Sequence, residues 1–226
     1  QGYYKAVWLQ QQRQDKAQMI QEAVINIRKN QPRVGCRKLK DHLAQGNIRV
    51  GRDRFIELMR SWSLLIKPKR NYKRTTDSRH RLKKYKNLIK SNPAKGPNQV
   101  WVSDITYLRT QAGFCYLSLI TDQYSRKIVG HHVHPNLTYS GVLKALSMAL
   151  KQKTQSKKYL IHHSDCGLQY CSDDYIALLK SHRVRISMTE ENHVYENALA
   201  ERVNGILKNE FLLTATWPSI HHARRA

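Results

Sequence analysis

The sequence predicts an α/β protein in which a mixed β-sheet with flanking helices follows a small all-α unit. Three observations predict this class. Apolar residues recur at helical spacing up to about residue 66, and strand-like apolar runs begin near residue 99. A segment dense in Lys and Arg separates the two patterns. Apolar residues make up 40% of the 226 residues, so a sizeable core can form.

Residues 1–66 are predicted to form three helices that resemble a helix-turn-helix DNA-binding domain. The expected helices cover residues 15–29, 36–45 and 52–62. Asp15 can cap the first helix, and Gly46 ends the second. The exposed side of the third is basic, and Arg52 and Arg54 are candidate DNA contacts. A small helical bundle with a solvated basic face is the alternative that this pattern leaves open.

Residues 67–97 are predicted to be a basic linker. Residues 67–90 carry eleven Lys and Arg and one acid, Asp77, and charge of one sign at this density does not fold by itself. We interpret the segment as a linker or as a helix that follows a phosphate backbone, and a solvated helical face is the alternative. The candidate DNA contacts here are Lys67, Lys69, Arg70, Lys73 and Arg74.

The formal charge of +24 predicts a polyanionic partner. Nucleic-acid-binding, ribosomal and membrane-surface proteins are all basic, so charge alone leaves three classes open. No stretch approaches the roughly 20 apolar residues of a membrane span, and no signal peptide is visible. We therefore expect a cytoplasmic protein with no membrane-spanning segment. Its four cysteines include no CxxC pair, which favours reduced thiols.

Residues 98–226 are predicted to form the α/β domain. Three strands joined by short turns predict an antiparallel meander, and the later strands are predicted to extend it in parallel through helical crossovers. The expected strands cover residues 100–108, 114–121, 127–134, 159–163 and 184–188. The expected helices cover residues 139–151 and 173–181 and a long segment from Asn197. This order is that of a ribonuclease-H-like fold.

Three carboxylates in this domain are candidate catalytic and metal-binding residues: Asp104, Asp165 and Glu201. Asp104 lies inside a predicted strand, Asp165 follows one, and Glu201 lies on the final helix. Acids that converge from separate elements can hold two divalent metal ions for attack on a phosphodiester. Taken singly, each has an ordinary alternative: an edge-strand Asp, a turn Asp, or one acid of a mixed polar helix face.

The final helix carries further candidates. Asn197, Glu201, Asn204 and Lys208 recur at a spacing that puts them on one face. Glu190, Glu191 and Glu196 also lie near in sequence, but we prefer Glu201 because a helix fixes its position. Asp122 is interpreted as a turn-capping residue or a structural ion pair. A zinc site is a minor alternative for His162, His163, Cys166 and Cys171, whose spacing fits no usual zinc pattern.

Four stretches carry a resemblance to a known family: WVSDITYL, GFCYLSLITDQYSRKIVG, HHSDCGLQY and ENALAERVNGILKNEF. They resemble the catalytic domain of bacterial insertion-sequence transposases of the retroviral-integrase-like (DDE) superfamily. In one subfamily the transposase is made from two overlapping reading frames. Its helix-turn-helix segment is similar to the upstream stretch VGCRKLKDHLAQGNIRVGRDRFIELMRSWSLL. The chain resembles the product of the second frame. Thirty-five residues separate Asp165 from Glu201, which is typical of this family.

The resemblance implies a DNA transposase that cleaves transposon ends and transfers strands. It implies that Asp104, Asp165 and Glu201 bind two Mg²⁺ ions, with Mn²⁺ as a substitute. Lys208 would touch DNA near the active site, and Arg202 and Asn197 are further candidate DNA contacts. Expected partners are the terminal inverted repeats, target DNA and at least one other copy of the chain, with no membrane partner. The expected location is the bacterial cytoplasm, at the nucleoid.

Three features depart from the family's pattern. Glu196 stands where relatives commonly have Asp, and Cys166 stands where a basic residue is common. The chain ends at HHARRA, before an expected Tyr-Asn-x-x-Arg segment, so we expect a truncated C-terminus. The alternatives are a ribonuclease-H-like nuclease or resolvase, which cleaves without joining, and a DNA-binding protein derived from a transposase.

Overall fold

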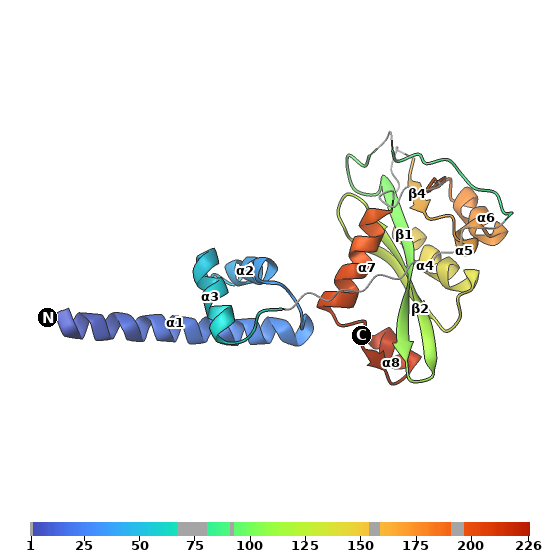
Figure 1. Cartoon of the computed structure of the whole chain (residues 1–226). Coiled ribbons are helices and arrows are strands. Elements are labelled where there is room, and N and C mark those ends of the chain that lie inside the picture. The colour runs from blue at the N-terminus through green and yellow to red at the C-terminus, as the bar shows by residue number, and fades with distance from the viewer. Residues whose placement is uncertain (1, 67–80, 91–92, 154–158, 191–196) are drawn as a thin grey trace. The chain divides into compact units, whose positions relative to one another are not determined.

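The computed structural model describes residues 2–66, 81–90, 93–153, 159–190 and 197–226 (Figure 1). The chain divides into two compact units. The first contains the residues up to 72 and residues 207–212, and the second contains residues 73–206 and 213–226. The candidate contacts Lys67, Lys69, Arg70, Lys73 and Arg74 lie outside the described residues.

The first unit contains three helices with one apolar core, as the sequence predicts. They are α1 (Gly2–Asn30), α2 (Cys36–Gln45) and α3 (Arg52–Ser61). The core joins all three helices through the buried side chains of Ile20, Val24, Leu39, Leu43, Phe55, Leu58 and Met59. Arg28 of α1 also links this helix to the segments after α1 and α3 by hydrogen bonds. Its guanidinium donates to the backbone carbonyls of Val34 at 3.3 Å and Leu64 at 2.8 Å.

The predicted start of the first helix was wrong. The helix begins at Gly2, not near Asp15, so its 29 residues are almost twice the expected length. The prediction followed the apolar stripe, which marks only the half that packs on α2 and α3. Residues 3–14 contain no Gly or Pro and are rich in good helix formers such as Gln, Lys, Ala and Leu, so the helix continues without that packing.

The second unit is built on a mixed β-sheet. Its strands are β1 (Val100–Thr110), β2 (Gly113–Asp122), β3 (Ile128–His134), β4 (Ile161–Ser164), β5 (Arg185–Met188) and β6 (Thr216–Trp217). The order is β3-β2-β1-β4-β5, and β6 pairs with β1. The first three strands are antiparallel, and β4 and β5 extend the sheet in parallel. This topology confirms the predicted ribonuclease-H-like fold.

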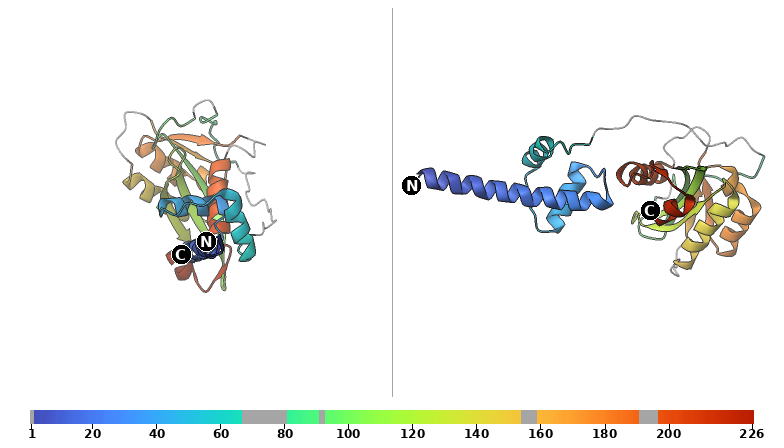
Figure 2. Two further views of the ribbon diagram at one scale, coloured as in Figure 1. Left: turned by 90° about the vertical axis from the view of Figure 1, so that its left-hand side faces the viewer. Right: turned by 90° about the horizontal axis from the view of Figure 1, so that it is seen from below.

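Helices cover both faces of the sheet (Figures 1 and 2). They are α4 (Tyr139–Lys151), α5 (Leu168–Cys171), α6 (Asp173–Ser181), α7 (Ala198–Glu210) and α8 (Ile220–Arg225). Side chains alternate along β1: Trp101 joins the core under α4, α5 and α6, whereas Val100 and Val102 pack with Ala200 of α7. By this alternation Asp104 belongs to the α7 face.

Helix α4 crosses β3 at very short range. A Cβ atom at Gly130 of β3 would lie 2.3 Å from the backbone oxygen of Ala145 and 2.9 Å from the Cβ of Ala149. Only glycine fits this crossing, so Gly130 sets the distance between the helix and the sheet. The close approach holds α4 against the buried core, which includes Val142, Leu146 and Leu150 on the same helix.

Three short elements were not predicted: α5, β6 and α8. Helix α8 packs near β3, where the guanidinium Nε of Arg224 donates to the backbone oxygen of Val133 at 3.1 Å. Strand β6 pairs in parallel with the end of β1. The described residues 81–90 contain no helix; instead Tyr85, Leu88 and Ile89 pack against the sheet's cores.

Candidate active site

Asp104 occupies the central strand of the sheet, as predicted. On β1 its neighbours Ser103 and Ile105 pair with Ile120 and Ser118 of β2. Because side chains alternate along the strand, Asp104 faces away from the α4 side. Its carboxylate accepts two hydrogen bonds, from the side-chain amide of Asn204 at 2.6 Å and from the backbone N–H of Ile105 at 2.8 Å. A carboxylate held inside a sheet is costly unless hydrogen bonds or a cation compensate it.

Asp165 directly follows β4 and lies beside Asp104. Strands β1 and β4 run parallel with Val102 opposite His163, and both acids lie two residues beyond that pair. An even step keeps each side chain on the same face as its paired residue. The Oδ1 atom of Asp165 accepts a hydrogen bond from the backbone N–H of Gly167 at 3.1 Å. A Cβ at position 167 would lie 3.1 Å from that oxygen, so glycine suits the turn.

Glu201 comes to the same face on α7. Two asparagines attach this helix to β1: the side-chain amide of Asn197 donates to the backbone oxygen of Ser103 at 3.1 Å, and Asn204 donates to Asp104. Glu201 lies between them on the helix and is exposed, whereas both asparagines are buried. The two bonds therefore fix the register in which α7 presents Glu201 to β1.

The electrostatics of Asp104 link the three acids. Its pKa is raised to about 7, chiefly by burial and next by the negative charge of Asp165. The hydrogen bonds from Asn204 and Ile105 lower the pKa, and the charge of Glu201 raises it further. Both other acids therefore act on Asp104 through space. A cation placed among these groups would relieve the repulsion.

Oxygen donors of this kind suit Mg²⁺ and Mn²⁺. Among the described residues, no three His, Cys, Asp or Glu side chains are assembled closely enough to surround one ion. Pairs of carboxylates centred on Asp104 remain the available ligands. Such pairs fit ions that complete their coordination with water and substrate phosphate.

A buried polar network that the sequence reasoning missed lies beneath the acids. The hydroxyl of Ser103 is 3.0 Å from the hydroxyl of Tyr170, and the hydroxyl of Tyr175 is 2.9 Å from Nε2 of His162. Burial raises the pKa of Tyr170 well above its usual value, and the charges of Asp165 and Asp104 contribute. Burial lowers the pKa of His162 to about 3, so this ring is neutral. The position of Tyr170, five residues after Asp165, was the available signal.

The zinc alternative is not supported. His162 contacts Tyr175, and Nδ1 of His163 lies 2.8 Å from the hydroxyl of Ser187. The thiol of Cys166 donates to the backbone oxygen of Thr189, and Cys171 contacts the sulfur of Met188. These side chains are buried structural groups, and the described residues contain no His/Cys/Asp/Glu cluster for a metal.

The remaining predicted residues fall into different environments. Asn197, a predicted DNA contact, is buried, and its side-chain amide is bonded to β1. Arg202 is exposed, and Lys208 is partly exposed on α7. Arg52 and Arg54 are exposed and pair with Asp53 at 2.9 Å and Glu57 at 3.4 Å. Asp122 caps its turn, as predicted.

Comparison with known proteins identifies the family. Residues 94–193 match the family described as Integrase core domain. The "Insertion element IS600 uncharacterized 31 kDa protein" of Shigella sonnei is 38% identical over 216 residues, which are 93% of this chain and 78% of that protein. The chain belongs to the insertion-element transposases of the DDE superfamily. Its function is accordingly DNA transposition, and its enzymatic class is that of the polynucleotidyl transferases.

Other relatives of this transposase are more distant or longer. "Transposase InsF for insertion sequence IS3A" of Escherichia coli (strain K12) is 36% identical over 187 residues, which are 80% of this chain and 63% of that protein. The HTLV-2 integrase catalytic core domain in complex with magnesium (trimeric form) is 22% identical, with a TM-score of 0.42 over 51% of this chain and 70% of that chain. A chain of the simian T-cell lymphotropic virus intasome in complex with PP2A regulatory subunit B56 gamma is 19% identical. That match has a TM-score of 0.46 and covers 77% of this chain and 55% of that chain.

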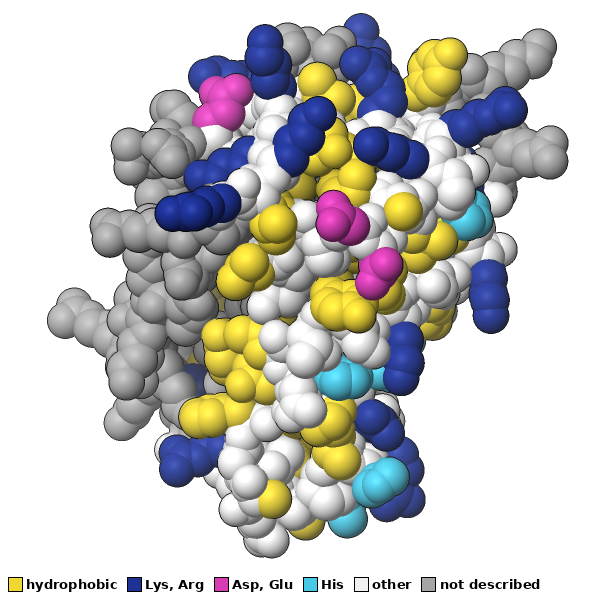
Figure 3. All heavy atoms as spheres, turned by 90° about the vertical axis from the view of Figure 1, so that its right-hand side faces the viewer, with side chains coloured by type: hydrophobic (Ala, Val, Ile, Leu, Met, Phe, Trp, Pro, Cys, Tyr) yellow, Lys and Arg dark blue, Asp and Glu magenta, His cyan; other side chains and the backbone are white. Residues whose placement is uncertain are grey.

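Membership of this family implies a divalent metal ion and DNA binding. The surface of the second unit is compatible with DNA. Figure 3 shows the face that carries α5 and α6, where Lys and Arg side chains are spread around the margin and acidic side chains are few. In the described residues, no helix is both long enough and apolar enough to span a bilayer.

Proposed function

We propose that this transposase cleaves DNA at the ends of an insertion element and joins the freed 3′-hydroxyl to another phosphodiester, with Asp104, Asp165 and Glu201 as its catalytic, metal-binding acids. The observation that carries the proposal is the convergence of these acids on one face. The parallel register of β1 and β4 supports the pairing of Asp104 with Asp165. The attachment of α7 to β1 supports the place of Glu201.

We propose two Mg²⁺ ions as the cofactor, with Mn²⁺ as a substitute. Asp104 interacts with both other acids, so it is the natural shared ligand, with Asp165 and Glu201 each completing one pair. Bound ions of this kind stabilise negative charge on the attacking and leaving oxygens of an in-line displacement. No protein nucleophile is needed, so no covalent protein–DNA intermediate is expected.

The protein's own groups prepare the acids for this role. Asn204 holds Oδ2 of Asp104 and the backbone N–H of Ile105 holds Oδ1, and each carboxylate oxygen keeps a further lone pair for a cation. The N–H of Gly167 holds Oδ1 of Asp165 in the same way. Because burial and the charge of Asp165 raise the pKa of Asp104 to about 7, metal ions and protons compete for this carboxylate near neutral pH.

The proposed substrates are the terminal inverted repeats of the element and a target DNA. The charge of +24 supports a polyanionic substrate. Pairing two DNA ends requires at least two active sites, so we propose that the chain acts as a homo-oligomer of at least two copies. Chromosomal DNA as the target places the reaction in the bacterial cytoplasm, at the nucleoid.

The decisive experiment is a strand-transfer assay with a labelled, precut element end, Mg²⁺ and plasmid target. The wild-type chain should give joined product, and Asp104→Asn, Asp165→Asn and Glu201→Gln should each lower it by at least 10³-fold, on the order of a lost metal ligand's effect. Asp174→Asn, an exposed acid on α6, is the matched control. Hydrolysis without any joined product would indicate a nuclease or resolvase instead.

A further inference from the structure

A cationic groove lies in the first unit. Its residues are far in the sequence from the three acids, and its charge is opposite to theirs. It is a cavity of about 540 Å³ between α1, α3 and the turn that precedes α3. Four basic side chains line it: Arg13, Lys16, Arg49 and Arg54. We call this feature the α1–α3 groove. Two of the four belong to α1, a helix in which the sequence pattern suggested no DNA contact.

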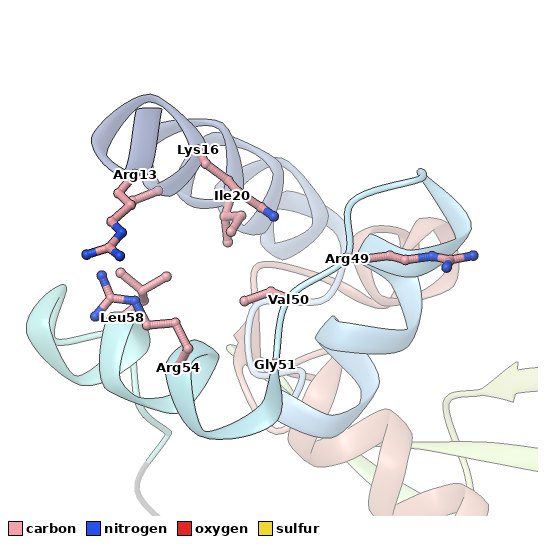
Figure 4. Close-up of a pocket in the computed structure, with 9 residues that line it drawn as sticks. Arg13, Lys16, Ile20, Arg49, Val50, Gly51, Arg54 and Leu58 are labelled. Carbon is pink, nitrogen blue, oxygen red and sulfur yellow. The ribbon is translucent and has the colours of Figure 1, made fainter. Parts of the chain in front are cut away.

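The floor of the groove is aliphatic. Ile20 and Leu58, which belong to the unit's apolar core, form it together with Val50 (Figure 4). No aromatic side chain and no carboxylate is among the residues that line it. A nucleobase would therefore find no ring to stack on. An occupant with alternating apolar and anionic parts would match both the floor and the rim.

The rim concentrates positive charge. Arg13 of α1 and Arg54 of α3 point toward one another across the groove (Figure 4). Arg54 also has Glu57 at 3.4 Å, in an exposed ion pair of small strength. In the part of the chain that the structure describes, Arg13, Lys16 and Arg49 form no ion pair within 4 Å. Two of these cations, Arg13 and Arg54, approach one another and repel unless an anion lies between them, whereas the side chain of Arg49 points away from them (Figure 4).

We propose that the α1–α3 groove binds the sugar–phosphate backbone of double-stranded DNA, with phosphates held by Arg13 and Lys16 on one side and by Arg54 on the other. The deoxyribose between two phosphates meets the aliphatic floor. The inference rests on the proposed function, which makes DNA the substrate. It adds a backbone-positioning site in which α1 and α3 act together, and such contacts set register and orientation without reading sequence.

The test is the salt dependence of DNA binding by the full chain. Affinity for a fluorescent duplex carrying the element end is measured by anisotropy from 50 to 400 mM salt. Each lost phosphate contact lowers the slope of log K against log[salt] by about 0.9. The double variant R13Q/K16Q should therefore lower the slope by about 2, and R54Q should lower it by about 1.

The matched control is K5Q/K29Q, which removes the same charge from exposed positions of the same helix outside the groove. It should change the slope by less than about half a unit, since only long-range attraction is lost. All four groove side chains are exposed, so the variants should keep the wild-type circular dichroism spectrum and melting temperature. That comparison excludes unfolding as the cause of weaker binding.

Two results would overturn the inference. The first is a groove variant whose slope falls no further than that of the control, while the wild-type chain binds and joins DNA; the proposed function then stands. The second is an unchanged DNA slope together with loss of binding to a labelled oligoglutamate peptide, which would make the groove a site for an acidic protein. A wild-type chain that neither binds nor joins DNA would instead refute the proposed function.

Discussion

The side-chain amide of Asn204 on α7 donates a 2.6 Å hydrogen bond to Oδ2 of Asp104 on β1. These residues are a hundred positions apart, and their bond ties the proposed catalytic helix directly to a proposed metal ligand. The bond also partly offsets the rise in the pKa of Asp104 that burial and Asp165 cause. A single amide therefore affects both the position and the charge of this carboxylate.

Asn204→Ala should lower strand transfer about 10- to 100-fold, as is typical when a group that orients a metal ligand is lost. The loss should be recovered in part at high Mg²⁺, because the acids remain but are less well ordered. A Mg²⁺ titration of strand-transfer rate checks this. Asn209→Ala, an exposed position on the same helix, is the control. An unchanged Mg²⁺ dependence would show that the bond does not position Asp104 for metal.

Asp104→Asn should stabilise the metal-free protein at high pH while abolishing activity. The folded pKa of Asp104 is about 7 and the usual value is 3.8, so the folded state holds this proton more tightly than the unfolded state. The ionised carboxylate therefore lowers the free energy of unfolding of the wild type. This loss is absent below pH 3.8, grows between pH 3.8 and 7, and is complete above pH 7. Melting temperatures in EDTA should therefore differ by several degrees at pH 8 and by little at pH 4.

The Asp174→Asn variant is again the control for this pH series, since it removes an exposed acid from α6. Its melting temperature should follow that of the wild type across the range. If Asp104→Asn were less stable than the wild type at pH 8 without metal, the burial of the Asp104 charge and its repulsion by Asp165 would be too weak to determine the stability of the fold.

Mg²⁺ should raise the melting temperature of the wild-type chain, because an ion that binds only the folded state stabilises it by about 2.7 kcal/mol at a hundredfold excess over its dissociation constant. The gain should be smaller at pH 6 than at pH 8, since protons compete for Asp104. Differential scanning fluorimetry measures both. Equal gains in the wild type and in Glu201→Gln would remove Glu201 from the set of ligands.

Gly130→Ala should destabilise the second unit by roughly 2–4 kcal/mol, because the new methyl group would overlap the backbone of α4 at Ala145. Gly205→Ala is a matched control, since a Cβ at that helical position meets no atom within 4 Å. It should stabilise the protein by about 0.5–1 kcal/mol. Urea denaturation measures both changes, and a neutral Gly130→Ala would mean that α4 can move away from β3 at little cost.

The elements with strong periodicity were predictable from the sequence alone. Strand β1 and helix α4 have patterns that only one type of element fits, and their ends lie within two residues of the predicted ones. The first half of α1 was missed because it buries nothing, so no apolar stripe marks it. The elements α5, β6 and α8 are too short for any period to be visible.

The proposed acids were predictable as a set, but their surroundings were not. Spacing puts Asn197, Glu201 and Asn204 on one face of a helix, yet it does not tell which of them meets the sheet. Burial divides them: the two asparagines bond to β1, and Glu201 stays exposed. Likewise tertiary folding brings the hydroxyl of Tyr170 to Ser103, the neighbour of Asp104 on β1, and local pattern does not encode this contact.

The contact between Arg224 and Val133 has a consequence for self-association. β3 ends the sheet's order next to β2, and the last strand of a sheet offers backbone groups to which another chain can add a strand. Here a guanidinium from α8 already occupies one of those carbonyls. A copy of this chain that added a strand there would first have to displace this guanidinium, which disfavours strand addition at Val133.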